Sequence, residues 1–282
     1  MRLTNATREG LSSSSFQTFA EVIQRELGIK MPSGKVNMLR SRLQRRLRQL
    51  GLDSFEEYEE LLLDSPQATE EFVHFTDAVT TNKTEFFRES AHFDYLTENC
   101  LPELDRNRNI PWHFKLWCAG CSSGEEPYSL SMVLNEYASF RPGFDHSILG
   151  TDISSQVLEN SKRAIYHHDR IGPIPENFRK KYLLRGKDTS LGLFRIAPNA
   201  RTKVSFSSLN FMRDSYPIRE TFDIVFFRNV LIYFDRPTQE AVVNKICEHL
   251  RPGGYLFISH SESLNGLDVP LNLVGSSVFK KW

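Results

Sequence analysis

Residues 114–129 of this 282-residue chain read FKLWCAGCSSGEEPYS, a short apolar run that leads through a glycine-containing turn into the acidic start of a helix. Apolar runs of this length that end at glycine are typical of buried strands. In an open α/β sheet, ligands bind at the carboxyl ends of the strands, where small residues let them approach the backbone. The segment therefore predicts a first strand followed by a ligand-binding turn.

Four more apolar runs follow this strand and alternate with helical stretches. They cover residues 146–153, 203–210, 222–230 and 254–260. Such alternation is typical of a parallel sheet with crossover helices, so we predict an α/β fold.

The interval between the second and third runs is too long for a single crossover helix. It contains a predicted helix over 155–165 and two strand-like pieces, at 182–184 and 193–196, around a polar turn. The simplest interpretation is a small antiparallel β-subdomain inserted at about residues 166–202.

The first 80 residues have helical periodicity instead. Apolar side chains at helical spacing predict four helices, at about residues 16–27, 33–50, 55–64 and 69–79. Gly28, Gly51 and Pro66 stand where the first three helices would end. We therefore expect an amino-terminal helical domain over residues 1–85 and an α/β domain over residues 86–282.

The composition is that of a globular protein, with 40% hydrophobic and 25% charged residues. No run approaches the ~18 apolar residues of a membrane span, and the amino terminus lacks the apolar core of a secretory signal. We expect a cytoplasmic protein without membrane insertion. Its four cysteines are too few and too irregularly spaced for a disulfide framework. The C-x-x-C of Cys118 and Cys121 lacks a second pair, so we expect no metal site.

The balance of 35 basic and 35 acidic side chains hides a local separation of charge. Residues 1–50 hold ten basic and three acidic side chains, residues 51–80 hold none and nine, and residues 81–282 hold 25 and 23. The neutral total disfavours a nucleic-acid binder that depends on bulk charge. Whatever purpose charge serves in this chain, it is concentrated in the helical domain.

Arginines account for the basic surplus in the second predicted helix. Arg42, Arg45 and Arg48 follow one another at intervals of three on the side opposite a leucine stripe, and Arg46 lies on the flank. In one interpretation they meet an acidic partner through a charge-steered encounter. In the other they pair with the acidic third helix, and each exposed pair contributes under about 1 kcal/mol.

Acidic residues follow the first two strands of the predicted sheet. Glu125 and Glu126 at the start of a helix would repel a pyrophosphate, but they suit a ligand with an ammonium group or ribose hydroxyls. Asp152 ends the second strand, where a carboxylate accepts hydrogen bonds from a ribose. Since the glycine fingerprint of dinucleotide sites is missing, the Glu125–Glu126 pair favours S-adenosylmethionine over a dinucleotide, whereas Asp152 suits either cofactor.

The later strands end in residues that suit the rest of such a site. Asn210 and Phe211 follow the third strand, where an amide and a ring would meet an adenine, although a loop cap or a core position explains them equally well. Residues 227–234 read FRNVLIYF and place Arg228, Asn229 and Tyr233 in the same crevice. The segment lacks the N-P-P-Y or D-P-P-Y pattern of enzymes that methylate nucleic-acid amines, so an oxygen acceptor is favoured.

Residues 80–88 read TTNKTEFFR, which alone would be a linker that caps a helix. Together with SSGEEPYS, DIS, the Asn210–Phe211 pair and RNVLIYF, this segment resembles the chemotaxis receptor methyltransferases, the CheR family. The likeness extends over nearly the whole chain and includes RRLRQLGLD at residues 45–53. It implies a helical domain, an S-adenosylmethionine-binding α/β domain with a β-subdomain insertion, and methyl esterification of glutamate carboxylates on bacterial chemoreceptors.

The resemblance also implies roles for individual residues. The implied cofactor contacts are Asn82, Thr84, Arg88, Glu126, Asp152, Asn210, Phe211, Arg228 and Asn229. Arg88 and Tyr233 would be catalytic and lie nearest the transferred methyl group. Arg42, Arg45, Arg46 and Arg48 would dock on the receptors' cytoplasmic methylation helices, and S-adenosylhomocysteine would be the product.

Three positions depart from the family pattern. Ser154 stands where an acidic residue often occurs, Phe211 replaces a leucine, and Asp188 occupies a place where a turn glycine can stand. The third departure bears on whether the β-subdomain tethers a carboxyl-terminal receptor peptide.

Two other classes of protein compete with this interpretation. One is a dehydrogenase on a similar sheet, which the missing glycine fingerprint disfavours. The other is a non-catalytic adaptor that binds S-adenosylmethionine as a signal. For the methyltransferase we expect a monomer.

Overall fold

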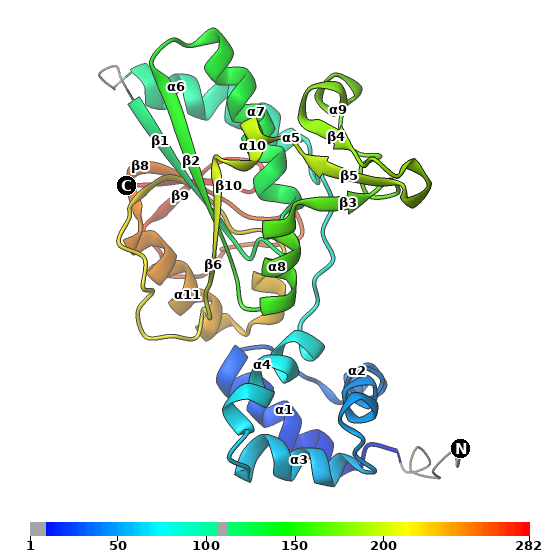
Figure 1. Cartoon of the computed structure of the whole chain (residues 1–282). Helices are drawn as coiled ribbons and strands as arrows, with labels where there is room; N and C mark the ends of the chain where they lie inside the picture. The colour runs from blue at the N-terminus through cyan, green and yellow to red at the C-terminus, as the bar shows by residue number, and fades with distance from the viewer. Residues whose placement is uncertain (1–9, 107–111) are drawn as a thin grey trace.

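The computed structural model describes residues 10–106 and 112–282. The first nine residues of the expected helical domain, and residues 107–111 ahead of the first strand, lie outside the described residues. Figure 1 shows a helical bundle beneath a layered α/β body, with a small separate sheet beside that body.

Four helices form the bundle, namely α1 (Ser13–Leu27), α2 (Val36–Leu50), α3 (Phe55–Asp64) and α4 (Ala68–Val79). The Ser12 side chain caps α1 by accepting a hydrogen bond from the Ser15 N–H, and Ser54 caps α3 in the same way. Gly28 ends α1 with φ at +70°, a conformation that disfavours residues with a Cβ. The apolar faces of the four helices meet in one core that contains Phe19, Leu43 and Phe75.

A charged hydrogen-bond network crosses this core. Glu71 of α4 is only 5% exposed, and Arg46 donates to both of its carboxylate oxygens, at 2.9 and 2.7 Å. The Tyr58 hydroxyl of α3 donates to the same carboxylate at 2.7 Å. Burial alone would raise the pKa of Glu71, but the bonds from Arg46 and Tyr58 hold it below its usual value. Arg46 is therefore bonded within the bundle, because a buried carboxylate needs a partner.

A seven-stranded sheet forms the body, in the order β6-β2-β1-β7-β8-β10-β9. The strands are β1 (Trp112–Ala119), β2 (Phe144–Asp152), β6 (Val204–Ser208), β7 (Phe222–Phe226), β8 (Leu250–Phe257), β9 (Leu271–Gly275) and β10 (Val278–Lys281). The first five in the sheet order are parallel, and β10 is antiparallel to both of its neighbours. The chain moves outward from β1 to β6 and then returns to β7, so the topological switch point lies between β1 and β7.

Helices cover both faces of the sheet (Figure 1). They are α5 (Ala91–Tyr95), a π-helical turn (Leu96–Cys100), α6 (Leu101–Arg106), α7 (Glu125–Phe140), α8 (Ser155–Arg163) and α11 (Arg236–Glu248). Alternate β1 side chains enter two cores, since Leu116 packs with Leu130 of α7 while Trp117 packs with Val243 of α11. The predicted α/β sheet with an all-helical amino-terminal domain is confirmed.

The inserted subdomain is a three-stranded antiparallel sheet in the order β3-β5-β4. It consists of β3 (Ile165–His167), α9 (Glu176–Tyr182), β4 (Leu183–Arg185), β5 (Leu193–Ile196) and α10 (Pro198–Arg201). Its small core contains Tyr166, Ile174 and Tyr182 and includes Phe86 from the linker that follows the bundle. The Tyr166 hydroxyl donates to the Ser123 carbonyl at 2.8 Å and so joins the subdomain to the turn after β1.

Two local expectations were wrong, and one hairpin was not predicted. The strand predicted over 222–230 ends at Phe226, because the chain turns at Asn229, whose φ is +61°. The helix predicted over 155–165 ends at Arg163, because Ala164 takes a left-handed conformation and β3 begins. The hairpin of β9 and β10 was not predicted, since β9 has mostly exposed side chains and lacks an apolar run. No helix in the described part of the chain is long and apolar enough to cross a membrane.

The Arg46→Ala substitution should destabilise the protein by about 3 to 5 kcal/mol, because it leaves the Glu71 carboxylate buried without its cation. Urea unfolding of the full chain would measure this change. Arg45→Ala is the matched control, because Arg45 is exposed on the same helix, and should change the free energy of unfolding by less than about 0.5 kcal/mol.

The pair should also make part of the stability dependent on pH. Because the pKa of Glu71 is lower in the folded chain than in the unfolded chain, its contribution is present above the unfolded pKa and is lost as the pH falls through the folded pKa. The difference between wild type and Arg46→Ala should therefore shrink in acid. A difference that stays constant from neutral pH to pH ~3 would contradict this assignment.

Candidate active site

A cavity of about 310 Å³ lies between the bundle and the carboxyl edge of the sheet, which is a size typical of small-molecule sites. The expected cofactor contacts and Tyr233 all line it: Asn82, Thr84, Arg88, Glu126, Asp152, Asn210, Phe211, Arg228, Asn229 and Tyr233. No arginine of α2 lines it. The sequence therefore predicted which side chains converge at the switch point.

The turn after β1 forms the cavity floor. Gly120 has φ at +83°, and a Cβ there would lie 2.5 Å from a Val230 methyl carbon, so only glycine fits. The N–H groups of Gly120 and Cys121 both donate to the Thr151 carbonyl at 2.8 Å. These bonds hold the ends of β1 and β2 side by side. Because Gly120 has no side chain and lines the cavity, a ligand can approach the backbone of this turn.

Asp152 at the end of β2 is buried beside this turn. Its carboxylate accepts hydrogen bonds from the backbone N–H of Ser122 at 2.8 Å and of Ser154 at 3.0 Å. Burial raises the pKa of Asp152, and the Ser154 and Ser122 N–H groups oppose that rise. The carboxylate keeps further lone pairs for hydroxyl donors from a ligand.

Arg228 supplies a buried cation at the end of β7. Its Nε donates to Glu126 at 2.6 Å, and its Nη1 donates to the Arg88 carbonyl at 2.8 Å. Within the residues described, Arg228 Nη2 makes no hydrogen bond. This nitrogen is nevertheless not fully buried, so a small molecule can reach it. Since the side chain lines the cavity, we conclude that Nη2 faces that space.

The linker from the bundle forms another wall, and the rest of the protein holds its backbone. The Asn82 carbonyl accepts from the Ser122 hydroxyl at 3.0 Å, and the Thr84 carbonyl accepts from Arg170 of the subdomain at 3.1 Å. Arg170 also pairs with the buried Glu125 carboxylate. The linker is thus connected to the turn after β1 and to the β-subdomain.

Asn210 and Phe211 serve the site in different ways. The Asn210 amide donates to the Glu26 carbonyl at 2.7 Å, and its oxygen accepts from the Met212 N–H at 2.9 Å. This amide therefore caps its own loop and ties the α/β domain to α1, which is the loop-cap alternative. Phe211 packs edge to face against Phe227 at 5.2 Å between ring centroids and still borders the cavity.

Asn229 and Tyr233 complete the wall that follows β7. Asn229 donates from its amide to the Ser259 hydroxyl at 2.7 Å and from its backbone to Glu262 at 3.0 Å. The Tyr233 carbonyl accepts from the Lys30 N–H of the bundle at 2.9 Å. The Tyr233 hydroxyl has no hydrogen-bond partner among residues 10–106 and 112–282.

Contrary to the expectation from the sequence, Arg42, Arg45, Arg46 and Arg48 do not form a single free surface. Arg42 donates to the carbonyls of Val79 and Thr80 and so caps the end of α4. Arg46 is held by Glu71. In the described part of the chain, Arg45 and Arg48 are exposed and make no ion pair, and no pair joins an α2 arginine to α3.

Sequence reasoning missed two parts of the site. The bundle contributes apolar side chains to the cavity wall, among them Leu27 at the end of α1, Met31 in the following loop and Met38 of α2, which the sequence does not distinguish from ordinary core residues. Glu89 and His92 lie beside Arg228 behind the cavity wall. The only signal for these two was their position just after TTNKTEFFR.

The donor set fits S-adenosylmethionine. Glu126 can accept from an ammonium group, the open nitrogen of Arg228 can donate to a carboxylate, and Asp152 can accept from ribose hydroxyls. The Phe211 ring and the apolar side chains of the bundle suit an adenine. A pyrophosphate has no comparable place beside Glu125 and Glu126.

Known proteins resemble this chain over both the helical bundle and the α/β body. A family model described as "CheR methyltransferase, SAM binding domain" matches residues 82–279, and one described as "CheR methyltransferase, all-alpha domain" matches residues 14–80. The chemotaxis protein methyltransferase of Klebsiella aerogenes is 35% identical over 97% of this chain and 91% of its own length.

Two further relatives are also chemotaxis protein methyltransferases. The protein of Escherichia coli is 35% identical over 96% of this chain and 92% of its own length. That of Borreliella burgdorferi is 35% identical over 98% of this chain and 95% of its own. The chain therefore belongs to the CheR family of S-adenosylmethionine-dependent chemotaxis methyltransferases.

Proposed function

We propose that this enzyme transfers the methyl group of S-adenosylmethionine to glutamate side-chain carboxylates of bacterial chemoreceptors and releases S-adenosylhomocysteine. One observation carries the proposal: a single cavity is bordered by Asp152 and Arg228 of the sheet and by Met38 of the arginine-rich helix α2. A cofactor site and a basic surface that suits an acidic partner thus belong to adjoining elements.

We assign the two functions to two domains, a helical domain over residues 1–85 and a methyltransferase domain over 86–282 with the subdomain at 166–202. The receptors' methylation helices lie on the cytoplasmic side, so we place the enzyme in the cytoplasm, acting as a monomer.

In this proposal the protein aligns the reactants and needs no general base. A glutamate side chain has an ordinary pKa of about 4.3, so its carboxylate is already the nucleophile at neutral pH. S-adenosylmethionine, when bound, supplies a methyl group on a positively charged sulfur. The enzyme's task is to hold the carboxylate oxygen roughly 3 to 3.5 Å from that methyl group in a site without water.

Individual side chains receive separate tasks. Glu126 would accept from the cofactor's ammonium group, and Arg228 would pair with its carboxylate. Asp152 would hold the ribose. Arg88 would orient a carboxylate near the transferred methyl group, and Tyr233, whose hydroxyl has no partner in the described chain, would donate a hydrogen bond there.

The same proposal gives Asn82, Thr84, Asn210, Phe211 and Asn229 the remaining contacts around the nucleoside and the amino-acid end. Asn210 could contact the cofactor through its amide only by sharing the atoms that now bond Glu26 and Met212. Its strongest contribution in this arrangement is to fix the loop that presents Phe211.

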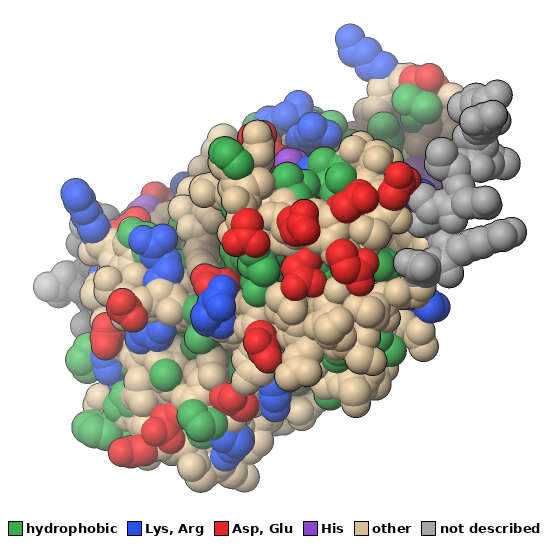
Figure 2. All heavy atoms as spheres, turned by 90° about the horizontal axis from the view of Figure 1, so that it is seen from below, with side chains coloured by type: hydrophobic (Ala, Val, Ile, Leu, Met, Phe, Trp, Pro, Cys, Tyr) green, Lys and Arg blue, Asp and Glu red, His purple; other side chains and the backbone are tan. Residues whose placement is uncertain are grey.

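Arg45 and Arg48 are the part of α2 that we propose for receptor docking. Both are exposed, and neither makes an ion pair in the described chain, so both remain free to meet glutamates on a receptor helix. Acidic side chains gather on the underside of the molecule, which Figure 2 shows from below, and α3 lies at the bottom of Figure 1. No ion pair in the described chain joins an α2 arginine to α3. Charge on α2 is therefore not neutralised by α3, and it can steer an acidic partner.

We also propose that the β-subdomain can bind a carboxyl-terminal receptor peptide. Its edge strand β4 pairs on one side only, and Leu184 and Arg185 on it are exposed. An extended peptide adds readily to such an edge by main-chain hydrogen bonds.

The direct test is incubation with radiolabelled S-adenosylmethionine and receptor-containing membranes. Label should enter the receptor as methyl esters that alkali releases. A non-catalytic adaptor would bind the cofactor and leave the receptors unlabelled, and label that resists alkali would exclude an ester. Receptors that lack their carboxyl-terminal peptide should be labelled more slowly at low concentration if the subdomain tethers them.

Substitutions at Arg88 and Tyr233 should lower kcat more than they weaken cofactor binding. We expect Arg88→Ala to lower kcat about 100-fold and Tyr233→Phe about tenfold, since the first removes an orienting cation and the second a single hydrogen bond. Steady-state kinetics at saturating cofactor would measure both effects. If both variants retained wild-type turnover, these residues would not be catalytic.

Charge reversal on the outer face of α2 should weaken receptor recognition alone. Arg45→Glu combined with Arg48→Glu should raise the receptor KM about tenfold at low salt, and less as salt screens the interaction. The affinity for S-adenosylhomocysteine should stay unchanged. Arg219→Glu, an exposed change elsewhere on the chain, is the control. A weakened cofactor affinity would instead give α2 a structural role.

A further inference from the structure

We propose that His92 is a positioning residue that directs the Arg228 guanidinium into the cofactor cavity by accepting a hydrogen bond on a neutral ring nitrogen. The inference rests on the proposed contact between Arg228 and the amino-acid end of the cofactor. It assigns a role to a side chain that does not itself line the cavity.

Arg228 is a cation in an almost closed environment, since its side chain is only 2% exposed. The rings of Phe226 and Phe93 lie 5.5 and 5.9 Å from its guanidinium carbon. A guanidinium held this way must have its hydrogen bonds satisfied, and those bonds decide which of its nitrogens stays open. Glu126 accepts from Nε, and the Arg88 carbonyl and His92 lie within hydrogen-bond distance of Nη1, which leaves Nη2 as the open nitrogen.

His92 provides one of the acceptors for Nη1. Its Nδ1 lies 3.1 Å from Arg228 Nη1, and its Nε2 lies 3.3 Å from the Ser276 carbonyl oxygen. A carbonyl oxygen only accepts, so Nε2 carries the proton. Nδ1 is then the lone-pair nitrogen, and the arginine donates to it. The hydrogen-bond partners of the ring therefore fix its tautomer.

Arg228 and His260 favour the neutral form of His92, and Glu89 is the one charged neighbour that opposes it. Arg228 after β7, Glu89 on its own segment and His260 after β8 face the ring, and Phe226 and Phe257 lie against it. Burial, Arg228 and His260 lower the pKa of His92 to about 4, against the opposing effect of Glu89. A protonated ring would place an N–H 3.1 Å from a guanidinium nitrogen, and the two positive charges would repel each other. Arg228 would then leave its position beside His92.

Glu89 supports the same arrangement from the other side. One of its oxygens accepts from the Ser259 hydroxyl at 2.6 Å, and the other lies 3.5 Å from Arg228 Nη1. Asn229 donates to the same Ser259 hydroxyl at 2.7 Å. The Glu89 carboxylate and the Ser259 hydroxyl thus form one hydrogen-bonded pair that contacts both Arg228 and Asn229, two neighbouring residues of the cavity wall.

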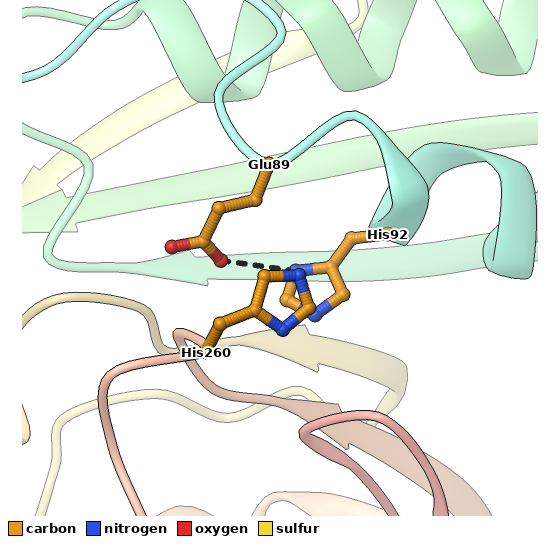
Figure 3. Close-up of side chains that lie close together, drawn as sticks. All are labelled: Glu89, His92 and His260. Atoms are coloured by element: carbon orange, nitrogen blue, oxygen red, sulfur yellow. Dashed lines mark ion pairs between the residues drawn. The ribbon is translucent and has the colours of Figure 1, made fainter.

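Glu89, His92 and His260 also have the composition of a metal site. Their potential ligand atoms lie within 4.8 Å of one another, and Figure 3 shows the two rings side by side with the Glu89 carboxylate facing His92. The dashed contact in Figure 3 spans 3.4 Å and would be an ion pair only with a protonated ring. Because the Arg228 cation already occupies the lone pair of His92, a divalent cation there would have to displace it. We therefore favour the positioning role over metal binding.

Two substitutions at His92 separate its two nitrogens. In His92→Asn the side-chain oxygen can take the place of Nδ1 and accept from Arg228, whereas in His92→Gln the amide reaches the place of Nε2 and leaves Nη1 without this acceptor. We expect His92→Gln to weaken S-adenosylhomocysteine binding about tenfold, and His92→Asn to stay within about threefold of wild type. Isothermal titration calorimetry on the full chain would measure both affinities.

A second ligand distinguishes positioning from a general loss of structure. 5′-Methylthioadenosine contains the same nucleoside without the amino-acid end, so its affinity should not depend on where Arg228 points. We expect His92→Gln to leave that affinity within about twofold of wild type. An equal loss of both ligands, or no loss of either, would overturn the proposed role.

His260→Ala tests the metal alternative, because His260 does not bond Arg228 in the described structure. We expect both affinities to match those of the wild type, with and without a chelator. If His260→Ala and the chelator each reproduced the His92→Gln effect, and zinc reversed the chelator's effect, the cluster would be a metal site and the proposal would fail. If the wild type bound neither ligand, the proposed cofactor site itself would be wrong.

Discussion

The burial of one cation, Arg228, organises the active side of the molecule. A guanidinium out of water is stable only with several acceptors, and here they come from segments far apart in the chain. Glu126 begins α7, Glu89 and His92 precede and begin α5, and the Arg88 carbonyl belongs to the linker. Meeting that requirement brings the linker, α7 and the end of β7 together, and these segments are three walls of the cavity.

Hydrogen bonds to a single carboxylate also join the bundle to the α/β domain. The Asp77 carboxylate of α4 accepts one hydrogen bond from the Ser154 hydroxyl and one from the Ser155 hydroxyl. It also accepts from the backbone N–H of Gln156 at the start of α8, with 3.3 Å between nitrogen and oxygen. A carboxylate at a helix start satisfies free N–H groups and favours the helix dipole. The helical domain thereby stabilises an element of its partner domain, and the cavity between them keeps a defined shape.

The sequence predicted the parts of the site that depend on strand ends. Asp152 and Arg228 could be placed because parallel strands bring their carboxyl ends to one edge, whatever the details of packing. The partners of Arg42 and Arg46 could not, because helical spacing gives a direction around the axis but does not say what lies in that direction. Arg42 bonds to carbonyls at the end of α4, and Arg46 pairs with Glu71 of the same helix. That Glu71 is buried and needs a cation is visible only in the tertiary structure.

Left-handed backbone conformations recur around the cavity. Phe87, Glu89, Ser122 and Asn229 all have φ between +48° and +61°, although none is glycine. Each such residue costs on the order of 1 kcal/mol or more relative to a relaxed backbone. Glycine at these positions would remove that cost, but it would also remove two side chains that line the cavity, Ser122 and Asn229, and the Glu89 side chain that supports Arg228. Selection for stability and selection for activity therefore oppose each other here, so the cavity rim is where a more thermostable descendant of this enzyme would be expected to lose catalysis first.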